Sequence, residues 1–195
     1  METIVTPFLA LLLALQSAVQ VMPRSSAAAA PETTISSGQG TAGARPAPKP
    51  VITEIRIGKS AHRLDLIAGK DVVRSYSVAL GSGGAGPKRF EGDKTTPVGT
   101  YKVTGRFKGL FHRFLVVSYP SEEDRARFAV LKAKGVVPAG RGVGHGIGIH
   151  GVGGKEYAGE HKKNDWTHGC IALDDSEIDE IAGMVKDGTR IVITD

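Results

Sequence analysis

The stretch "NDWTHGCIAL", residues 164–173, contains Cys170, the only cysteine in a chain of 195 residues. A histidine, His168, stands two residues before the thiol, and a second His-Gly pair, His150-Gly151, ends the apolar segment "GIGIH" further upstream. The apolar alternation of that segment is typical of a strand. We therefore expect a strand to carry His150 towards a loop that holds Cys170.

Three roles are open for this thiol. A lone cysteine is often a small buried hydrophobe, and by residue type alone packing is the commoner role. Metal binding is the second role, but no Cys-x-x-Cys or His-x-x-x-His pair is present, which weighs against a structural zinc site. Nucleophilic attack is the third, and it needs a base, a group that orients the base, and donors for an oxyanion. The residues that bear on the metal role are His145, His150, His161, His168 and Cys170.

The residues around the thiol meet the three needs of a nucleophile. His150 is the better base, because a strand can deliver its ring across to the Cys170 loop, and the carbonyl of Gly151 can hold the ring in one tautomer. His168 is too near in sequence to reach the sulfur easily. Its backbone N–H, with those of Gly169 and Cys170, can instead face an oxyanion, and Gly169 lets the backbone approach a ligand closely.

Composition sets the class of protein. The chain is 41% hydrophobic and 23% charged, which is an ordinary globular balance. Its net charge of +5 fits an anionic partner, but it does not choose between nucleic acid, acidic lipid and cell-wall polymer. With a single cysteine, no intramolecular disulfide can form.

The N-terminal part of the chain predicts export. Residues 4–15, "IVTPFLALLLAL", have the length of a signal-peptide core, and "SSAAAA" at 25–30 offers small-residue cleavage sites. We expect a signal peptide over residues 1–30, with an uncleaved membrane anchor as the alternative, because the segment before the core carries Glu2 and no basic residue. Residues 31–50, rich in Pro, Ala, Gly, Ser and Thr, predict a flexible linker.

The remaining residues, 51–195, predict one folded domain that is mostly β with a few helices. Alternating apolar residues, with turn residues between the segments, indicate strands. A capping Ser121 with acids in the first turn and lysines in the last predicts a helix over 121–135, and apolar spacing predicts another at about 176–186. The expected strands cover 51–57, 63–67, 72–80, 100–107, 146–150 and 190–194. The glycine-rich segment 81–87 lacks the Gly-Lys-Ser/Thr ending of a phosphate loop, so we expect a loop that joins strands.

Two motifs together carry a family resemblance. "IHGVGG…DWTHGCIAL", with "FEGDKTTPVGTYKV" at residues 90–103, resembles the L,D-transpeptidase catalytic domain, the YkuD domain, over roughly residues 51–195. The resemblance implies a YkuD-type β-sandwich in which Cys170 is the nucleophile and His150 is the proton donor and acceptor. The family's oxyanion donors map onto the backbone of His168, Gly169 and Cys170. The resemblance also implies an oxyanion or substrate role for Thr167, which stands where serine is commoner.

The resemblance also implies a reaction. Cys170 would attack the amide before D-Ala on a peptidoglycan stem tetrapeptide, release D-Ala, and pass the acyl group to an amine of a second stem or of a wall protein. Such activity belongs to peptidoglycan synthesis, cell-wall biogenesis and cell shape, in the periplasm or cell envelope. No metal, organic cofactor or nucleic acid is implied. A wall amidase that uses water as acceptor, and a wall-binding module without turnover, are the alternative functions.

Two features of the chain depart from the commoner family pattern. Ala172 occupies a position that is Arg or Asn in many members, so a substrate contact by that side chain is missing. The segment 111–135 is expected to be a long insertion, which places the chain nearer the small periplasmic members, some of which hydrolyse rather than transfer. The acyl acceptor is therefore open.

Overall fold

The computed structural model describes residues 50–195 of the chain. The signal peptide or anchor expected over 1–30, and the linker expected over 31–50 apart from its last residue, lie outside the described residues. The strands are β1 (Glu54–Gly58), β2 (Arg63–Ala68), β3 (Asp71–Ser77), β4 (Gly99–Gly109), β5 (His112–Val117), β6 (Gly148–His150), β7 (Ile171–Ala172) and β8 (Arg190–Thr194). The helices are α1 (Glu122–Ala133) and α2 (Asp175–Met184), with the short 3-10 turns η1 (Lys155–Tyr157) and η2 (Glu160–Lys163).

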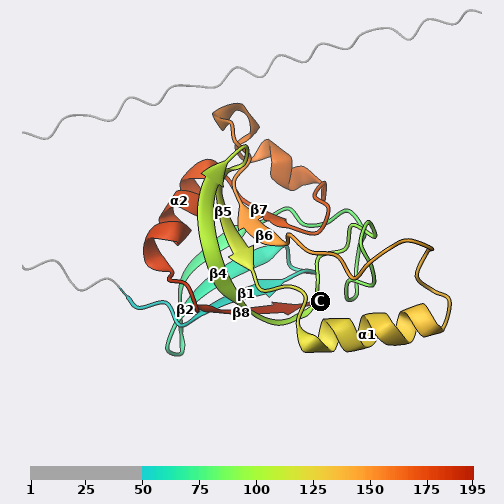
Figure 1. The fold of residues 1–195 in the computed structure, drawn as a ribbon. Helices are drawn as coiled ribbons and strands as arrows, with labels where there is room; N and C mark the ends of the chain where they lie inside the picture. Colours follow the sequence, from blue (N-terminus) through green and yellow to red (C-terminus); the bar gives the residue numbers. More distant parts are fainter. Residues whose placement is uncertain (1–49) are drawn as a thin grey trace, which may run out of the picture. The chain divides into compact units, whose positions relative to one another are not determined.

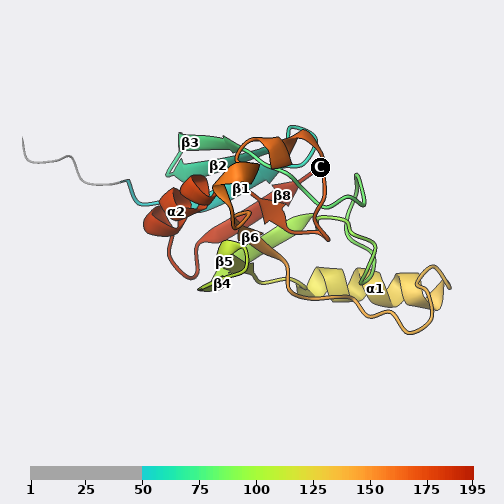
Figure 2. The same ribbon diagram turned by 90° about the horizontal axis from the view of Figure 1, so that it is seen from above.

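One eight-stranded sheet forms the domain, in the order β3-β2-β1-β8-β4-β5-β6-β7. The long strand β4 belongs to both halves of this sheet: residues 99–102 pair with β8, and residues 103–109 pair with β5. Figures 1 and 2 show the two halves meeting along β4, with α2 packed beside β5. The prediction of a mostly β fold with a few helices is confirmed.

A single hydrophobic core joins the two halves. Ile55 and Leu64 come from the β1–β2 half, Leu115 and Ile171 come from the β5–β7 half, and all four side chains are at most 1% exposed. Burial of each such side chain contributes roughly 1.5–3 kcal/mol relative to exposure. Strand β1 begins at Glu54, three residues later than the alternation from Val51 predicts.

The two α-helices begin at capping boxes. In α1 the Ser121 hydroxyl accepts the Asp124 N–H at 3.2 Å, and the Asp124 carboxylate accepts the Ser121 N–H at 3.0 Å, so the predicted cap is confirmed. The same carboxylate accepts the Tyr101 hydroxyl at 2.9 Å, which ties α1 to β4. Helix α2 is capped by Asp174, slightly before the predicted start.

The segment 111–135 is not one insertion, and that prediction is wrong for its first part. His112–Val117 is strand β5, which lies inside the sheet between β4 and β6. Leu115 and Val117 point into the core, because alternate side chains of a strand face opposite sides. Within residues 50–195, no helix has both the length and the apolar character needed to cross a membrane.

Candidate active site

Strand pairing brings the His150 and Cys170 segments together. β6 runs parallel to β7, with Ile149 opposite Ile171 and His150 opposite Ala172. Cys170 immediately precedes β7 and lies two residues before Ala172, so its side chain emerges on the same face of the sheet as that of His150. Two segments that are distant in sequence therefore present a thiol and an imidazole to one site.

The His150 ring is held in one orientation. It is 2% exposed, and its Nδ1 lies 2.6 Å from the carbonyl oxygen of Gly151. A carbonyl only accepts hydrogen bonds, so Nδ1 carries the proton and Nε2 keeps a free lone pair. The turn after the ring is fixed by Asp175, whose carboxylate accepts the N–H groups of Val152 at 2.9 Å and Gly153 at 3.0 Å. Asp175 belongs to none of the sequence motifs, so its place beside the site was not predicted.

Aromatic rings enclose His150. Phe114 stacks on it at 5.6 Å between ring centroids, Phe111 lies at 4.7 Å, and Trp166 meets it edge-on at 6.0 Å. Burial among these rings lowers the pKa of His150, although the Gly151 carbonyl opposes the shift and the nearby His161 adds to it. The imidazole is therefore neutral at pH 7 and able to accept a proton.

The Cys170 thiol is half-buried and donates to the carbonyl of Gly146, 3.6 Å away. Burial raises the pKa of Cys170, while a hydrogen bond from the backbone of Gly148 and the positive charge of Lys88 act in the opposite direction. Thiol and imidazole are thus both neutral at rest. Proton transfer to a base must accompany attack by the sulfur.

The loop that carries the thiol is shaped by Thr167. The Thr167 hydroxyl donates to the carbonyl of Cys170 at 2.7 Å and accepts the Gly169 N–H at 3.1 Å. Because that N–H is already bonded inside the loop, the structure does not favour Gly169 as an oxyanion donor, and its role stays a prediction. The N–H groups of His168 and Cys170 are left as the candidate donors, and the His168 side chain itself is exposed.

Gly169 is required for close packing of the Cys170 loop. Its φ is +122°, and a Cβ at this position would lie 2.8 Å from the carbonyl oxygen of Thr95. Only glycine allows the Cys170 loop to approach the segment around Thr95 this closely.

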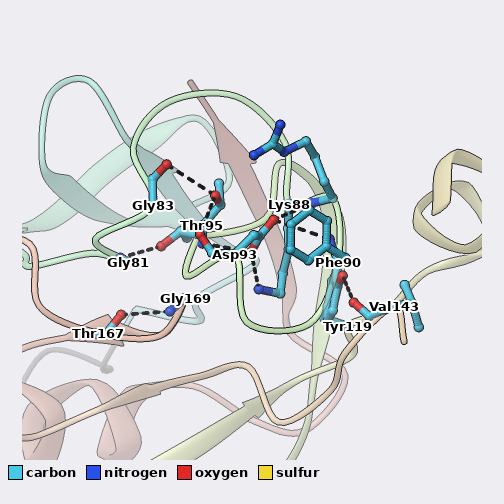
Figure 3. A network of polar contacts seen from close by, with 12 residues as sticks. Gly81, Gly83, Lys88, Phe90, Asp93, Thr95, Tyr119, Val143, Thr167 and Gly169 are labelled. Atoms are coloured by element: carbon cyan, nitrogen blue, oxygen red, sulfur yellow. Dashed lines mark hydrogen bonds and ion pairs between the residues drawn. The ribbon is translucent and has the colours of Figure 1, made fainter. Parts of the chain in front are cut away.

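A buried ion pair organises that supporting segment (Figure 3). The Asp93 carboxylate accepts Lys88 Nζ at 2.6 Å, the Arg89 N–H at 2.6 Å and the Thr95 N–H at 3.0 Å. The side chains of Lys88 and Asp93 are 3% and 0% exposed. Burial alone would raise the pKa of Asp93, but Lys88 and the backbone N–H groups outweigh it and hold the pKa below the ordinary value.

The Asp93 segment contacts the Cys170 loop partly through the glycine-rich segment 81–87. Gly81 donates its N–H to the Thr96 hydroxyl at 2.8 Å, and a Cβ on Gly81 would lie 2.8 Å from the Cα of Gly169. Gly83 donates to the Lys94 carbonyl at 3.0 Å. The segment 81–87 thus lies in the connection between β3 and β4, as predicted, and it packs against the site.

Ala172 is buried. Its side chain is 0% exposed, and its backbone exchanges two hydrogen bonds with Ala79, at 2.8 and 3.0 Å. The loss of a substrate contact at this position stays a prediction. Across residues 50–195, no three His, Cys, Asp or Glu side chains lie close enough together to hold a metal ion.

Comparisons with known proteins agree with this architecture. The sequence model of the YkuD family, the L,D-transpeptidase catalytic domain, matches residues 52–193. A relative in Bacillus subtilis (strain 168), named "Putative L,D-transpeptidase YqjB", is 28% identical over 150 residues, which are 76% of this chain and 74% of that protein.

Two solved structures have the same fold. The helical cell shape determining protein Pgp2 from Campylobacter jejuni superposes with a TM-score of 0.53 at 23% identity, over 74% of this chain and 48% of that one. Bd1075 from Bdellovibrio bacteriovorus gives a TM-score of 0.50 at 18% identity, again over 74% of this chain and 48% of the other. The chain thus spans about half the length of each solved structure.

Proposed function

Because this chain belongs to the YkuD family of L,D-transpeptidase catalytic domains, we propose that it is an exported cysteine transpeptidase that acts on peptidoglycan. The substrate that donates the acyl group is a stem tetrapeptide, and the acceptor is an amine of a second stem or of a wall protein. One observation supports the proposal: β6 pairs in parallel with β7, so that His150 lies opposite Ala172, two residues after Cys170.

In the acylation step, Cys170 Sγ attacks the carbonyl carbon of the amide that precedes D-Ala. His150 Nε2 takes the thiol proton, and the N–H groups of His168 and Cys170 donate to the oxyanion. The C–N bond then breaks, His150 returns the proton to the departing amine, and D-Ala leaves. A thioester on Cys170 remains, and the His150 imidazole, which the Gly151 carbonyl holds in place, is neutral again.

In the second step, an amine attacks the thioester carbonyl and gives up one proton to His150 Nε2. The C–S bond breaks, and His150 returns that proton to the sulfur, which restores the neutral thiol. The product is a new amide that cross-links two stems or attaches a stem to a wall protein.

The proposed location is the periplasm or another part of the cell envelope. Support comes from the apolar residues 4–15, and from the net charge of +5, which suits an anionic wall. The neighbour Pgp2 is described as determining helical cell shape. We include cell shape in the proposal as a consequence of wall cross-linking.

The test is incubation of the protein with disaccharide tetrapeptide, followed by mass spectrometry of the products. Released D-Ala with a cross-linked dimer supports transfer, whereas D-Ala with only a shortened stem identifies hydrolysis. Failure to release D-Ala contradicts the proposal. The matched control is Cys170→Ala, which removes the sulfur and should abolish both products.

A further inference from the structure

A pocket of about 310 Å³ opens beside the catalytic imidazole, lined by Phe111, Val152, Tyr157, His161 and Trp166. It lies where the turn between β4 and β5 meets the segment of η1 and η2, which Figure 1 shows side by side in yellow-green and orange. Phe111 and Trp166 are also two of the rings that contact His150. The pocket therefore shares two of its rings with the surroundings of His150.

The rings of this pocket are exposed. Tyr157 is 54% exposed, Trp166 39% and Phe111 38%. Aromatic side chains grouped around a concavity offer a rigid apolar surface at low entropic cost, and such groups mark ligand sites. Their exposure here has a function only if something flat and partly apolar covers them.

His161 supplies the polar group of the pocket. Its side chain is 6% exposed, and its Nε2 lies 3.0 Å from Asp174 Oδ1. Because a carboxylate only accepts, Nε2 carries a proton and donates it to Asp174. Among the described residues, the buried Nδ1 has no hydrogen-bond partner. His161 thus brings one unused hydrogen-bonding atom to the wall of the pocket.

The charge near the pocket is already balanced. None of its five lining residues carries a permanent charge. The neighbouring Lys162 pairs with Asp174 at 3.0 Å and with Glu177 at 2.6 Å. A charged ligand group would lose its hydration here without gaining a partner. The ammonium and carboxylate groups of a stem peptide therefore do not suit this pocket.

We propose that the pocket binds one N-acetylhexosamine ring of the glycan strand, the sugar that bears the stem peptide. This inference rests on the proposed function and adds a sugar subsite to it. A hexosamine ring is neutral, has an apolar C–H face for stacking on Tyr157 or Trp166, and carries hydroxyl groups, each both donor and acceptor, that can pair with His161 Nδ1. Of the groups on a disaccharide peptide, it alone meets all three requirements.

Binding is measured with the disaccharide alone, without peptide. Trp166 is the only tryptophan in the chain, so its fluorescence reports on this pocket. The full chain carrying Cys170→Ala is titrated, which separates binding from turnover. A saturable change in emission is expected, and Tyr157→Ala should weaken it by roughly 3- to 10-fold, the range of one lost aromatic contact. Tyr157→Phe keeps the ring and should bind like the parent.

The kinetic measurement compares kcat/KM for D-Ala release from disaccharide tetrapeptide and from the free tetrapeptide. We expect a higher kcat/KM for the sugar-bearing substrate. Tyr157→Ala should bring the ratio of the two values towards one. The control is Val72→Ala in β3, whose side chain is equally open at 53% exposure; it should leave the preference unchanged.

Equal use of the two substrates by the parent protein, or no saturable response to the disaccharide, overturns the sugar subsite while the proposed function stands. If neither peptide substrate releases D-Ala, the proposed function fails instead. The fluorescence titration then still decides the subsite.

Discussion

Substitution of Asp93 by asparagine tests the Lys88–Asp93 ion pair, which lies in the segment that supports the Cys170 loop. The carboxylate accepts one ammonium hydrogen bond and three backbone N–H groups, from Arg89, Phe90 and Thr95. Asparagine has nearly the same shape, but it removes the negative charge and turns one acceptor into a donor that faces N–H groups. Lys88, only 3% exposed, is then left without its counter-charge.

The expected cost is large because the pair is buried. Removal of one partner of a buried ion pair costs about 3–5 kcal/mol, most of it from the uncompensated charge. With a urea m-value of about 2–3 kcal/mol/M, the unfolding midpoint should fall by roughly 1–2.5 M. Trp166 fluorescence reports the transition. Asp187→Asn breaks the exposed pair with Arg106 and should lower the midpoint far less.

Two further measurements separate charge from shape. The pKa of Asp93 is lowered in the folded state. Its contribution to the free energy of unfolding is therefore fully present above the ordinary carboxyl pKa of about 3.9, and it is lost as the pH falls through the pKa of the folded state. The difference in free energy of unfolding between the parent and Asp93→Asn should therefore disappear at acidic pH. The double variant Lys88→Met with Asp93→Asn should recover part of the loss. A loss under about 1 kcal/mol for Asp93→Asn at pH 7, or fully additive costs in the double variant, would show that the pair contributes little to stability.

Three other predictions follow from the site. Burial lowers the pKa of His150 and raises that of Cys170. The pH profile of kcat/KM for D-Ala release should therefore have its acid limb below the ordinary histidine pKa of about 6.5 and its alkaline limb above the ordinary cysteine pKa of about 8.5. An acid limb above the histidine value would contradict a neutral imidazole and a neutral thiol at rest. Thr167→Val should cost about 1–3 kcal/mol in urea unfolding and slow acylation, because the loop loses both bonds of the hydroxyl, whereas Thr167→Ser should restore both. Gly148→Ala should lower the free energy of unfolding by roughly 1–3 kcal/mol, because its Cβ would lie 2.0 Å from the Phe114 ring. Gly58→Ala, whose nearest contact would be 3.7 Å away, should be tolerated. Equal urea midpoints for the two variants would show that the ring moves aside.

Local signals predicted the parts of the fold that depend on nearby residues. The alternation of the β1–β2–β3 region, and the Ser121 cap of α1, rest on side-chain spacing and on bonds within one turn. Strand β5 was missed because its six residues mix charged, aromatic and aliphatic side chains, and its place in the sheet comes from pairing with β4 and β6.

The features of the site also divide into those that local motifs predict and those that only the folded chain shows. The His-Gly and Thr-His-Gly-Cys motifs identified the residues that meet at β6 and β7. The internal bond of the Gly169 N–H, the convergence of backbone donors on Asp93, and the anchoring of the turn by Asp175 are set by the path of the chain in three dimensions. No residue pattern in a single sequence reports which N–H a loop has already used.

The most direct test of the account is the intact mass of the protein during turnover of disaccharide tetrapeptide. The account predicts a transient adduct equal to the donor minus D-Ala, found by peptide mapping on Cys170 and discharged by an added amine. His150→Gln should slow its formation by orders of magnitude. An adduct on another residue, or D-Ala release by Cys170→Ala at the parent rate, would contradict the central claim.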